Sequence, residues 1–252
     1  MLSATSPTIN SRLLSLPPET LSMFIKRAEA ELATRKSRNR LAEYRPYTKQ
    51  RVFHAAGAIH RERLFMAGNQ LGKTVAGGNE WATHLTGRYP DWWDGRVFEG
   101  PVRFWAAGVT GESTRDNPQR ILMGPPQQEE AWGTGAIPFD AIKGWERARG
   151  VPDLLDSVIV KFGGGGDVQA KESVLSFKAY EKGRRKWQGE TLDGVWFDEE
   201  PPLDIYTEGL TRTNARNGIV MVTFTPLEGM SDVVGLFLTD ADIAEMQKGE
   251  AR

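Results

Sequence analysis

The chain has 252 residues, of which 39% are hydrophobic and 26% charged, with a formal net charge of -1. These proportions argue against a disordered chain, and the near-zero charge excludes nucleic-acid binding through a global positive field. The absence of cysteine excludes disulfides and cysteine-based zinc sites, and neither a signal peptide nor an apolar run of roughly 20 residues is recognisable, so we expect a cytoplasmic protein without a membrane segment.

The first helical pattern follows Pro17. Apolar residues then recur every three or four positions, which predicts an amphipathic helix that extends towards Tyr44 and ends before Pro46. A second short helix is predicted over residues 48–58. We therefore expect residues 1–44 to form an N-terminal helical extension.

From residue 45 the chain alternates short apolar runs with helical patterns. The apolar runs predict strands at residues 63–67, 102–106, 157–162, 174–177, 194–197 and 219–223. We expect the third and fourth of these strands to form a hairpin, and helices at residues 73–85 and 114–122. Nearly continuous apolar strands are typical of a sheet covered on both faces by helices. The sequence therefore predicts a three-layer α/β fold with a mostly parallel central sheet, in a core domain of residues 45–240, followed by a tail of residues 241–252.

A glycine-containing loop follows the first predicted core strand and precedes a helix. It matches the pattern G-x-x-x-x-G-K-[ST], except that Ala67 replaces the first glycine. In such loops backbone N–H groups hold phosphate oxygens, the lysine contacts the β- and γ-phosphates, and the hydroxyl binds Mg²⁺. The predicted nucleotide-binding residues are Ala67, Gly68, Asn69, Gln70, Leu71, Gly72, Lys73 and Thr74. The alternative is an ordinary turn that contains Gly-Lys-Thr by chance.

Two adjacent carboxylates, Asp198 and Glu199, follow the strand predicted at residues 194–197. Asp198 is predicted to bind Mg²⁺ together with Thr74, and Glu199 to polarise the attacking water as a general base, with Lys73 as the second catalytic residue. Alternatively, the two acids lie at the N-terminus of the next helix, where negative charge is favourable; this explanation suits Asp198 least, because its strand runs directly into it.

Gln50 lies upstream of the loop, within the segment Pro46-Tyr47-Thr48-Lys49-Gln50. Its amide is a candidate for adenine recognition, with Tyr47 or Pro46 beside the base. An exposed helix glutamine is an equally good interpretation of the same residue.

Four segments in this order resemble the ATPase domain of the large terminase subunit of tailed bacteriophages: residues 45–50 (RPYTKQ), 69–74 (NQLGKT), 196–201 (WFDEEP) and 223–226 (TFTP). Residues 85–93 and 184–189 also resemble terminase segments. The resemblance implies an additional-strand P-loop NTPase fold of the RecA type and a motor that uses ATP and Mg²⁺ to move double-stranded DNA into a procapsid.

It also implies a ring of copies (a pentamer), contacts with the portal protein and the small terminase subunit, and a place in the host cytoplasm at the portal. The alternatives are another P-loop ATPase, such as a helicase-like enzyme or a kinase, and an assembly module that binds ATP without turnover.

The resemblance assigns a coupling role to Thr223 and Thr225, although threonine is also common in strands. Many terminases carry an arginine early in the phosphate loop, where this chain has Asn69. The compensating positive charge must then come from another residue, from the same or a neighbouring copy. The candidates are Arg184, Arg185 and Arg212, each of which could instead be a surface charge or a salt-bridge partner.

Basic residues concentrate in two segments, residues 35–51 and 182–186, which either contact DNA phosphates or form solvated surfaces. Full-length large terminases also carry a C-terminal nuclease domain, and only 26 residues follow Pro226. We therefore expect that this chain does not cleave DNA.

Overall fold

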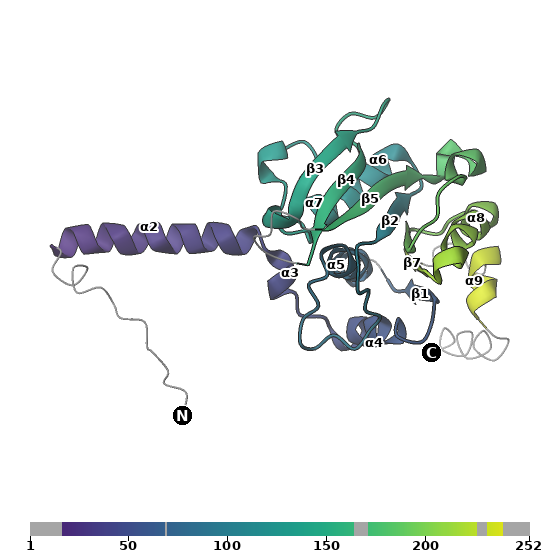
Figure 1. Ribbon diagram of the computed structural model, residues 1–252, viewed down its shortest axis with the longest axis horizontal. Helices are drawn as coiled ribbons and strands as arrows, with labels where there is room; N and C mark the ends of the chain where they lie inside the picture. Colours follow the sequence, from purple (N-terminus) through teal and green to yellow (C-terminus); the bar gives the residue numbers. More distant parts are fainter. Residues whose placement is uncertain (1–16, 69, 164–170, 226–230, 239–252) are drawn as a thin grey trace. The chain divides into compact units, whose positions relative to one another are not determined.

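The computed structural model describes residues 17–68, 70–163, 171–225 and 231–238 (Figure 1). The chain divides into two compact units, residues 1–38 and 39–252. In the first unit, helix α2 (Pro18–Ser37) begins with proline and carries an acidic side chain in its first turn, both of which favour a helix start.

The helix expected to extend towards Tyr44 ends earlier, at Ser37. A separate short helix, α3 (Arg40–Glu43), belongs to the second unit, because its Leu41 is buried in the hydrophobic core of that unit. Residues 39–44 therefore fall within the larger unit and outside the smaller one. Helix α4 (Thr48–Ala56) follows, close to the predicted position.

The second unit is built on a single seven-stranded sheet within the described residues, in the order β1-β7-β6-β2-β5-β4-β3 (Figure 1). The strands are β1 (Glu62–Met66), β2 (Arg103–Gly108), β3 (Ile142–Arg147), β4 (Leu155–Phe162), β5 (Lys171–Ala179), β6 (Gly194–Asp198) and β7 (Ile219–Phe224). Within this order, the neighbouring strands β1, β7, β6, β2 and β5 are parallel to one another. At one edge of the sheet, β4 pairs antiparallel with β5, and β3 pairs antiparallel with β4. The mostly parallel sheet is confirmed.

Helices cover both faces of the sheet, which gives the predicted three layers. The helices of the second unit that follow β1 are α5 (Lys73–Thr86), α6 (Gly111–Thr114), α7 (Arg120–Met123), α8 (Leu203–Thr213) and α9 (Asp232–Phe237). Alternate strand residues face opposite sides: Phe104 joins the cluster that contains α5, and Trp105 joins the cluster that contains α8 and α9. Short 3-10 helices include η4 (Tyr180–Lys182) and η5 (Arg184–Trp187).

Helix α5 packs closely against β6 and α7, and glycines at the contacts permit this approach. A Cβ atom at Gly77 would lie 2.7 Å from Cε2 of Trp196, and one at Gly78 would lie 2.3 Å from Cγ2 of Ile121. The start of α5 is therefore held next to the C-terminal end of β6, where the predicted acids lie.

Two elements differ from the predictions. Strand β3 was not predicted, because most of its side chains are exposed and its sequence lacks a clear apolar alternation. The helix expected at residues 114–122 is three pieces: α6, a π-helical turn (Arg115–Gln119) and α7. Pro118 lies inside the π-helical turn and cannot donate a helical hydrogen bond. Within the described residues, none of the helices has both the length and the hydrophobicity that a membrane span requires.

Candidate functional site

The predicted phosphate-binding loop connects the C-terminal end of β1 to the N-terminal end of α5. Gly72 caps the helix with a φ of 78°, a left-handed conformation that glycine adopts readily, and Lys73 is the first helical residue. The free N–H groups and the positive dipole at the start of this 14-residue helix favour a bound phosphate. Asn69 lies outside the described residues.

Predicted site residues from the start of α5 and from the C-terminal ends of β6 and β7 meet at one edge of the sheet. Thr74 Oγ1 donates to Asp198 Oδ1 at 3.1 Å, and Thr223 Oγ1 donates to the same oxygen at 2.8 Å. Lys73 Nζ donates to Thr225 Oγ1 at 2.5 Å. Strands β6 and β7 are neighbours in parallel, so their C-terminal ends bring Asp198 and the two threonines together.

Asp198 is buried, with 2% of its surface exposed. Burial raises the pKa of its carboxyl group to about 6, against hydrogen bonds from Thr223 and Thr74 that lower it. The Thr74 hydroxyl and the Asp198 carboxylate are hard oxygen ligands of the kind that Mg²⁺ prefers. A bound cation would also favour the ionised carboxylate, so this donor set fits Mg²⁺.

Glu199 has a φ of 69°, which is strained for a residue other than glycine. Its N–H donates to the Thr223 carbonyl at 2.8 Å, and its own carbonyl accepts from the Tyr180 hydroxyl at 2.8 Å. Its Oε2 lies 3.5 Å from the amide nitrogen of Thr225. The catalytic carboxylate predicted from the sequence therefore lies beside Thr225, the partner of Lys73.

A matching family model identifies the family of the chain, and two sequence relatives carry the same description. The model described as terminase large subunit, T4likevirus-type, N-terminal matches residues 64–249. This chain belongs to the large terminase subunit family. The large terminase subunit of Salmonella phage P22 is 47% identical over 210 residues, which cover 79% of this chain and 42% of that protein. That of Enterobacteria phage LP7 is 32% identical over 131 residues, which cover 52% of this chain and 27% of the relative.

The chain thus spans less than half the length of these two terminase subunits. Among solved structures, the large terminase ATPase domain of Thermus phage P74-26 is similar with a TM-score of 0.52 and 20% identity, over 76% of this chain and 68% of that one. At this identity the likeness establishes the fold, which is the terminase-type P-loop fold predicted from the sequence.

Gln50 supports the phosphate-binding loop of this terminase chain directly. Its side chain is 3% exposed, its Nε2 donates to the Gly72 carbonyl at 2.8 Å, and its Oε1 accepts from the Tyr47 N–H at 2.8 Å. The amide is therefore engaged by the protein, and it is not the exposed helix glutamine of the alternative interpretation. Adenine recognition by Gln50 stays a prediction.

A buried polar cluster lies behind the loop and was not predicted. Glu80 of α5 forms an ion pair with Arg63 of β1, and its Oε2 lies 2.7 Å from His54 Nδ1. Burial alone would raise the pKa of Glu80, but Arg63 and the hydrogen bonds from His54 and His84 hold it well below its usual value. His54 Nε2 in turn lies 3.1 Å from the Tyr44 hydroxyl, which contacts Gln50. No sequence motif marks this cluster, because its members come from separate elements.

The three arginines proposed to complete the terminase site lie apart from it in this single copy. Arg184 Nε and Arg212 both bind the buried carboxylate of Glu208, at 2.8 and 2.9 Å. Arg185 is exposed and forms no ion pair with the described residues. Within those residues, no hydrogen bond or ion pair joins any of the three arginines to Lys73 or Glu199.

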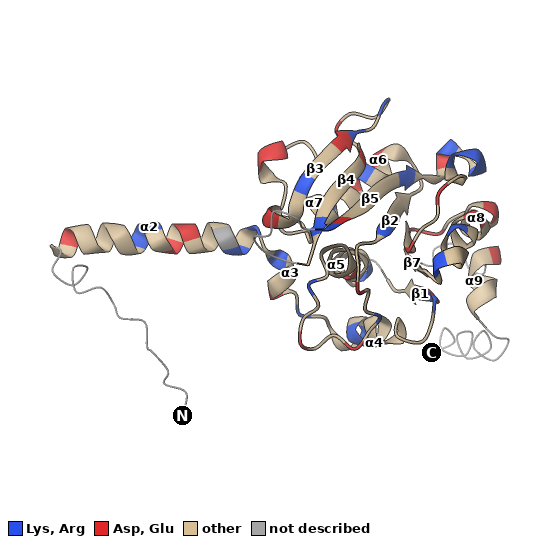
Figure 2. Ribbon diagram, in the orientation of Figure 1, with Lys and Arg blue, Asp and Glu red and all other residues tan. Residues whose placement is uncertain are grey.

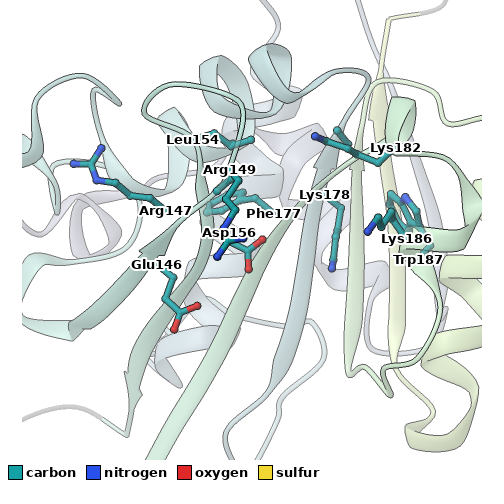
Figure 3. Close-up of a pocket in the computed structure, with 12 residues that line it drawn as sticks. Glu146, Arg147, Arg149, Leu154, Asp156, Phe177, Lys178, Lys182, Lys186 and Trp187 are labelled. Atoms are coloured by element: carbon teal, nitrogen blue, oxygen red, sulfur yellow. The ribbon is translucent and has the colours of Figure 1, made fainter.

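Two hollows lie along the same edge of the sheet. A cleft of about 640 Å³ is lined by Glu199, Tyr180 and Thr225, among others. A second hollow of about 480 Å³, here called the basic pocket, lies at the ends of β3 and β5 (Figure 3). Its basic side chains are Arg147, Arg149, Lys178, Lys182 and Lys186, and its acidic ones are Glu146 and Asp156.

Proposed function

We propose that this chain is the ATP-hydrolysing motor domain of a viral DNA-packaging terminase, which couples hydrolysis to translocation of double-stranded DNA into a procapsid. The observation that carries the proposal is the shared acceptor Asp198 Oδ1, which binds the hydroxyls of Thr74 from the phosphate-binding loop and Thr223 from β7. A chance Gly-Lys-Thr turn would not place its threonine on a buried carboxylate at the end of a neighbouring parallel strand.

Each residue of the site has a role in the proposed reaction. The loop and the start of α5 bind the phosphates, and Lys73 leaves Thr225 to contact the β- and γ-phosphates. Thr74 and Asp198 would hold Mg²⁺, which would neutralise phosphate charge in the complex with ATP. Glu199 polarises the attacking water, and its distance from Thr225 permits Thr225 and Thr223 to report loss of the γ-phosphate.

Asn69 stands where many terminases carry a loop arginine, and we assign the positive charge of that arginine to a residue from a neighbouring copy in a ring. Support comes from Arg185, which is exposed and unpaired among the described residues, whereas Arg184 and Arg212 are bound to Glu208. Mixing an Arg185→Ala subunit with a Glu199→Gln subunit is expected to restore part of the turnover that each lacks alone. If no mixture of an arginine variant with Glu199→Gln regains activity, action between copies loses its support.

DNA contact is assigned to the basic pocket. Figure 2 shows Lys and Arg gathered on the short helical segment after β5, the cluster noted in the sequence at residues 182–186. The fold adds Lys178 of β5, Arg147 at the end of β3 and Arg149 just after it, although Arg147 also pairs with Glu129 and Asp153. Binding through such side chains releases counterions and weakens steeply with salt.

The contact can be tested with a duplex oligonucleotide in a salt titration. Lys182→Ala and Lys186→Ala together are expected to reduce the slope of log K against log salt by about 2. The matched control is Lys143→Ala on β3, because Lys143 is paired with Glu172 outside the pocket. An unchanged slope in the double variant would place the DNA elsewhere.

The main experiment compares ATP turnover by the wild type and Glu199→Gln, with and without double-stranded DNA. We expect turnover that DNA stimulates, and a loss of at least about 100-fold in the Glu199→Gln variant. Turnover must be measured over a range of protein concentration, because ring assembly depends on it. No turnover at any concentration would favour an ATP-binding assembly module. The portal protein, the small terminase subunit, a pentameric ring and a location at the procapsid portal in the host cytoplasm belong to the same proposal.

A further inference from the structure

We infer that Tyr180 is a positioning residue that holds the catalytic Glu199 in its strained conformation and links it to the basic pocket. The inference rests on the proposed function, since it gives that ATPase a built-in response to DNA. It concerns a residue that no motif singles out and that lies outside the phosphate-binding loop.

The backbone of Glu199 is fixed from two sides. Its N–H is bound by the Thr223 carbonyl of β7, and its carbonyl accepts the Tyr180 hydroxyl at 2.8 Å. The same hydroxyl lies 3.2 Å from the carbonyl of Asp198. A left-handed conformation at a residue other than glycine persists only where its surroundings enforce it. These two hydrogen bonds hold the backbone of Glu199 in this conformation, and the backbone fixes the point from which the carboxylate extends.

Tyr180 is itself held rigidly. Its ring is 5% exposed and packs against Trp187 and Phe197, with centroids 6.1 and 6.0 Å away. Burial, with the nearby charges of Asp198 and Glu199, raises the pKa of Tyr180 well above its usual value. The phenol therefore keeps its proton at any pH near neutral and remains a hydrogen-bond donor.

The segment around Tyr180 connects the two hollows. Lys178 and Lys182 line the basic pocket (Figure 3). Tyr180, between them in the sequence, lines the cleft beside Glu199. The next residue, Glu181, accepts a hydrogen bond from the Gly111 N–H at 2.8 Å, and its own N–H donates to the Val109 carbonyl at 3.1 Å.

Lys182 is exposed and lies two residues from Tyr180, so a DNA phosphate bound by Lys182 would act on the chain close to the phenol. A change in the position of the phenol would alter its hydrogen bond to the Glu199 carbonyl, and thus the position of the Glu199 carboxylate. The geometry gives DNA binding a direct route to the catalytic base that does not pass through the phosphate-binding loop.

The test is Tyr180→Phe, which keeps the ring and removes the hydroxyl. We expect kcat to fall about fivefold to tenfold while the affinity for ATP stays within about twofold, because the nucleotide contacts are unchanged. The stimulation of turnover by double-stranded DNA is expected to fall towards one, at DNA concentrations that saturate binding. The matched control is Tyr206→Phe, which removes another buried tyrosine hydroxyl, the donor to Glu62, in the same core cluster.

A Tyr180→Phe protein with wild-type kcat and wild-type DNA stimulation would overturn the inference and leave the proposed function standing. A wild-type protein that does not hydrolyse ATP would overturn the proposed function, and this inference with it. Amide hydrogen exchange on the wild type gives a second measurement that needs no variant. Saturating DNA is expected to change the exchange of residues 179–183 and of Glu199, and equal exchange with and without DNA would contradict the link.

Discussion

Replacement of Asp198 by asparagine is expected to stabilise the nucleotide-free protein at neutral pH, although it removes a residue of the proposed Mg²⁺ site. The side chain is buried, and its pKa is raised from 3.8 to about 6. The two threonine hydroxyls can still donate to the amide oxygen of the asparagine, which has nearly the same shape as the carboxylate. The substitution therefore isolates the cost of keeping a charge at this position.

The sign and size follow from the two pKa values. Below about pH 4 the folded and unfolded states both hold the proton, and the group makes no difference between them. Between about pH 4 and pH 6 the folded state keeps a proton that the unfolded state has lost, so the stability of the wild type falls as the pH rises. At about 1.4 kcal/mol per pKa unit, the raised pKa corresponds to a loss of about 3 kcal/mol above pH 6. The new amide N–H₂ group requires a partner and offsets about 1 kcal/mol of the gain.

The assay is urea unfolding at pH 4, 5, 6, 7 and 8 with a metal chelator and without nucleotide. The Asp198→Asn protein is expected to exceed the wild type by about 2 kcal/mol at pH 8; as the pH falls the difference should pass through zero and reach about 1 kcal/mol in favour of the wild type towards pH 4, where only the cost of the amide remains. Asp91→Asn serves as the control, because Asp91 is exposed. A difference between Asp198→Asn and wild type that does not change with pH, or a variant that is less stable at pH 8, would refute the reasoning.

Three further substitutions test other parts of the structure. Gln50→Ala removes the side chain that binds the Gly72 carbonyl, and we expect ATP affinity to weaken about tenfold in calorimetry; an unchanged affinity would contradict a supporting role. Glu80→Gln leaves the buried charge of Arg63 without a counter-charge, and urea unfolding at pH 7 should show a loss of about 3–5 kcal/mol, whereas a loss below about 1 kcal/mol would refute it. Gly77→Ala should destabilise the protein by about 2 kcal/mol because its methyl group meets an indole at 2.7 Å, while Gly235→Ala, with nothing within 4 Å, should stabilise it slightly.

The sequence predicted the parts of the site that local patterns encode. The phosphate-binding loop is a contiguous motif between a strand and a helix, and Asp198 ends an apolar run, so their places in the fold follow from short segments. The order of the strands in the sheet brings the loop and Asp198 together. The alternation of strands and helices in the sequence predicted that most of these strands are parallel.

The remaining features depend on contacts between distant segments. The partner of Gln50 is Gly72, 22 residues away, so the sequence could not separate adenine recognition from support of the loop. Tyr180 donates a hydrogen bond to the backbone carbonyl of Glu199, and hydrogen bonds to backbone atoms cannot be recognised from a pattern of side chains. Strand β3 escaped prediction because it is an edge strand whose exposed side chains include lysine, glutamate and arginine, and such residues are typical of protected sheet edges.

The order of the strands also sets the distance between the proposed nucleotide site and strand β3. From β7, which carries Thr223, to β3 there are five steps between neighbouring strands. At about 4.8 Å per step this arm is about 24 Å long, so a rotation of about five degrees at the nucleotide end would carry β3 through about 2 Å. That displacement is of the same order as the rise between successive base pairs, about 3.4 Å. Under the proposed function, with ATP at one end of the sheet and DNA at the basic pocket, a small rotation at the nucleotide end would therefore produce a movement of the DNA-binding end comparable to one base-pair step.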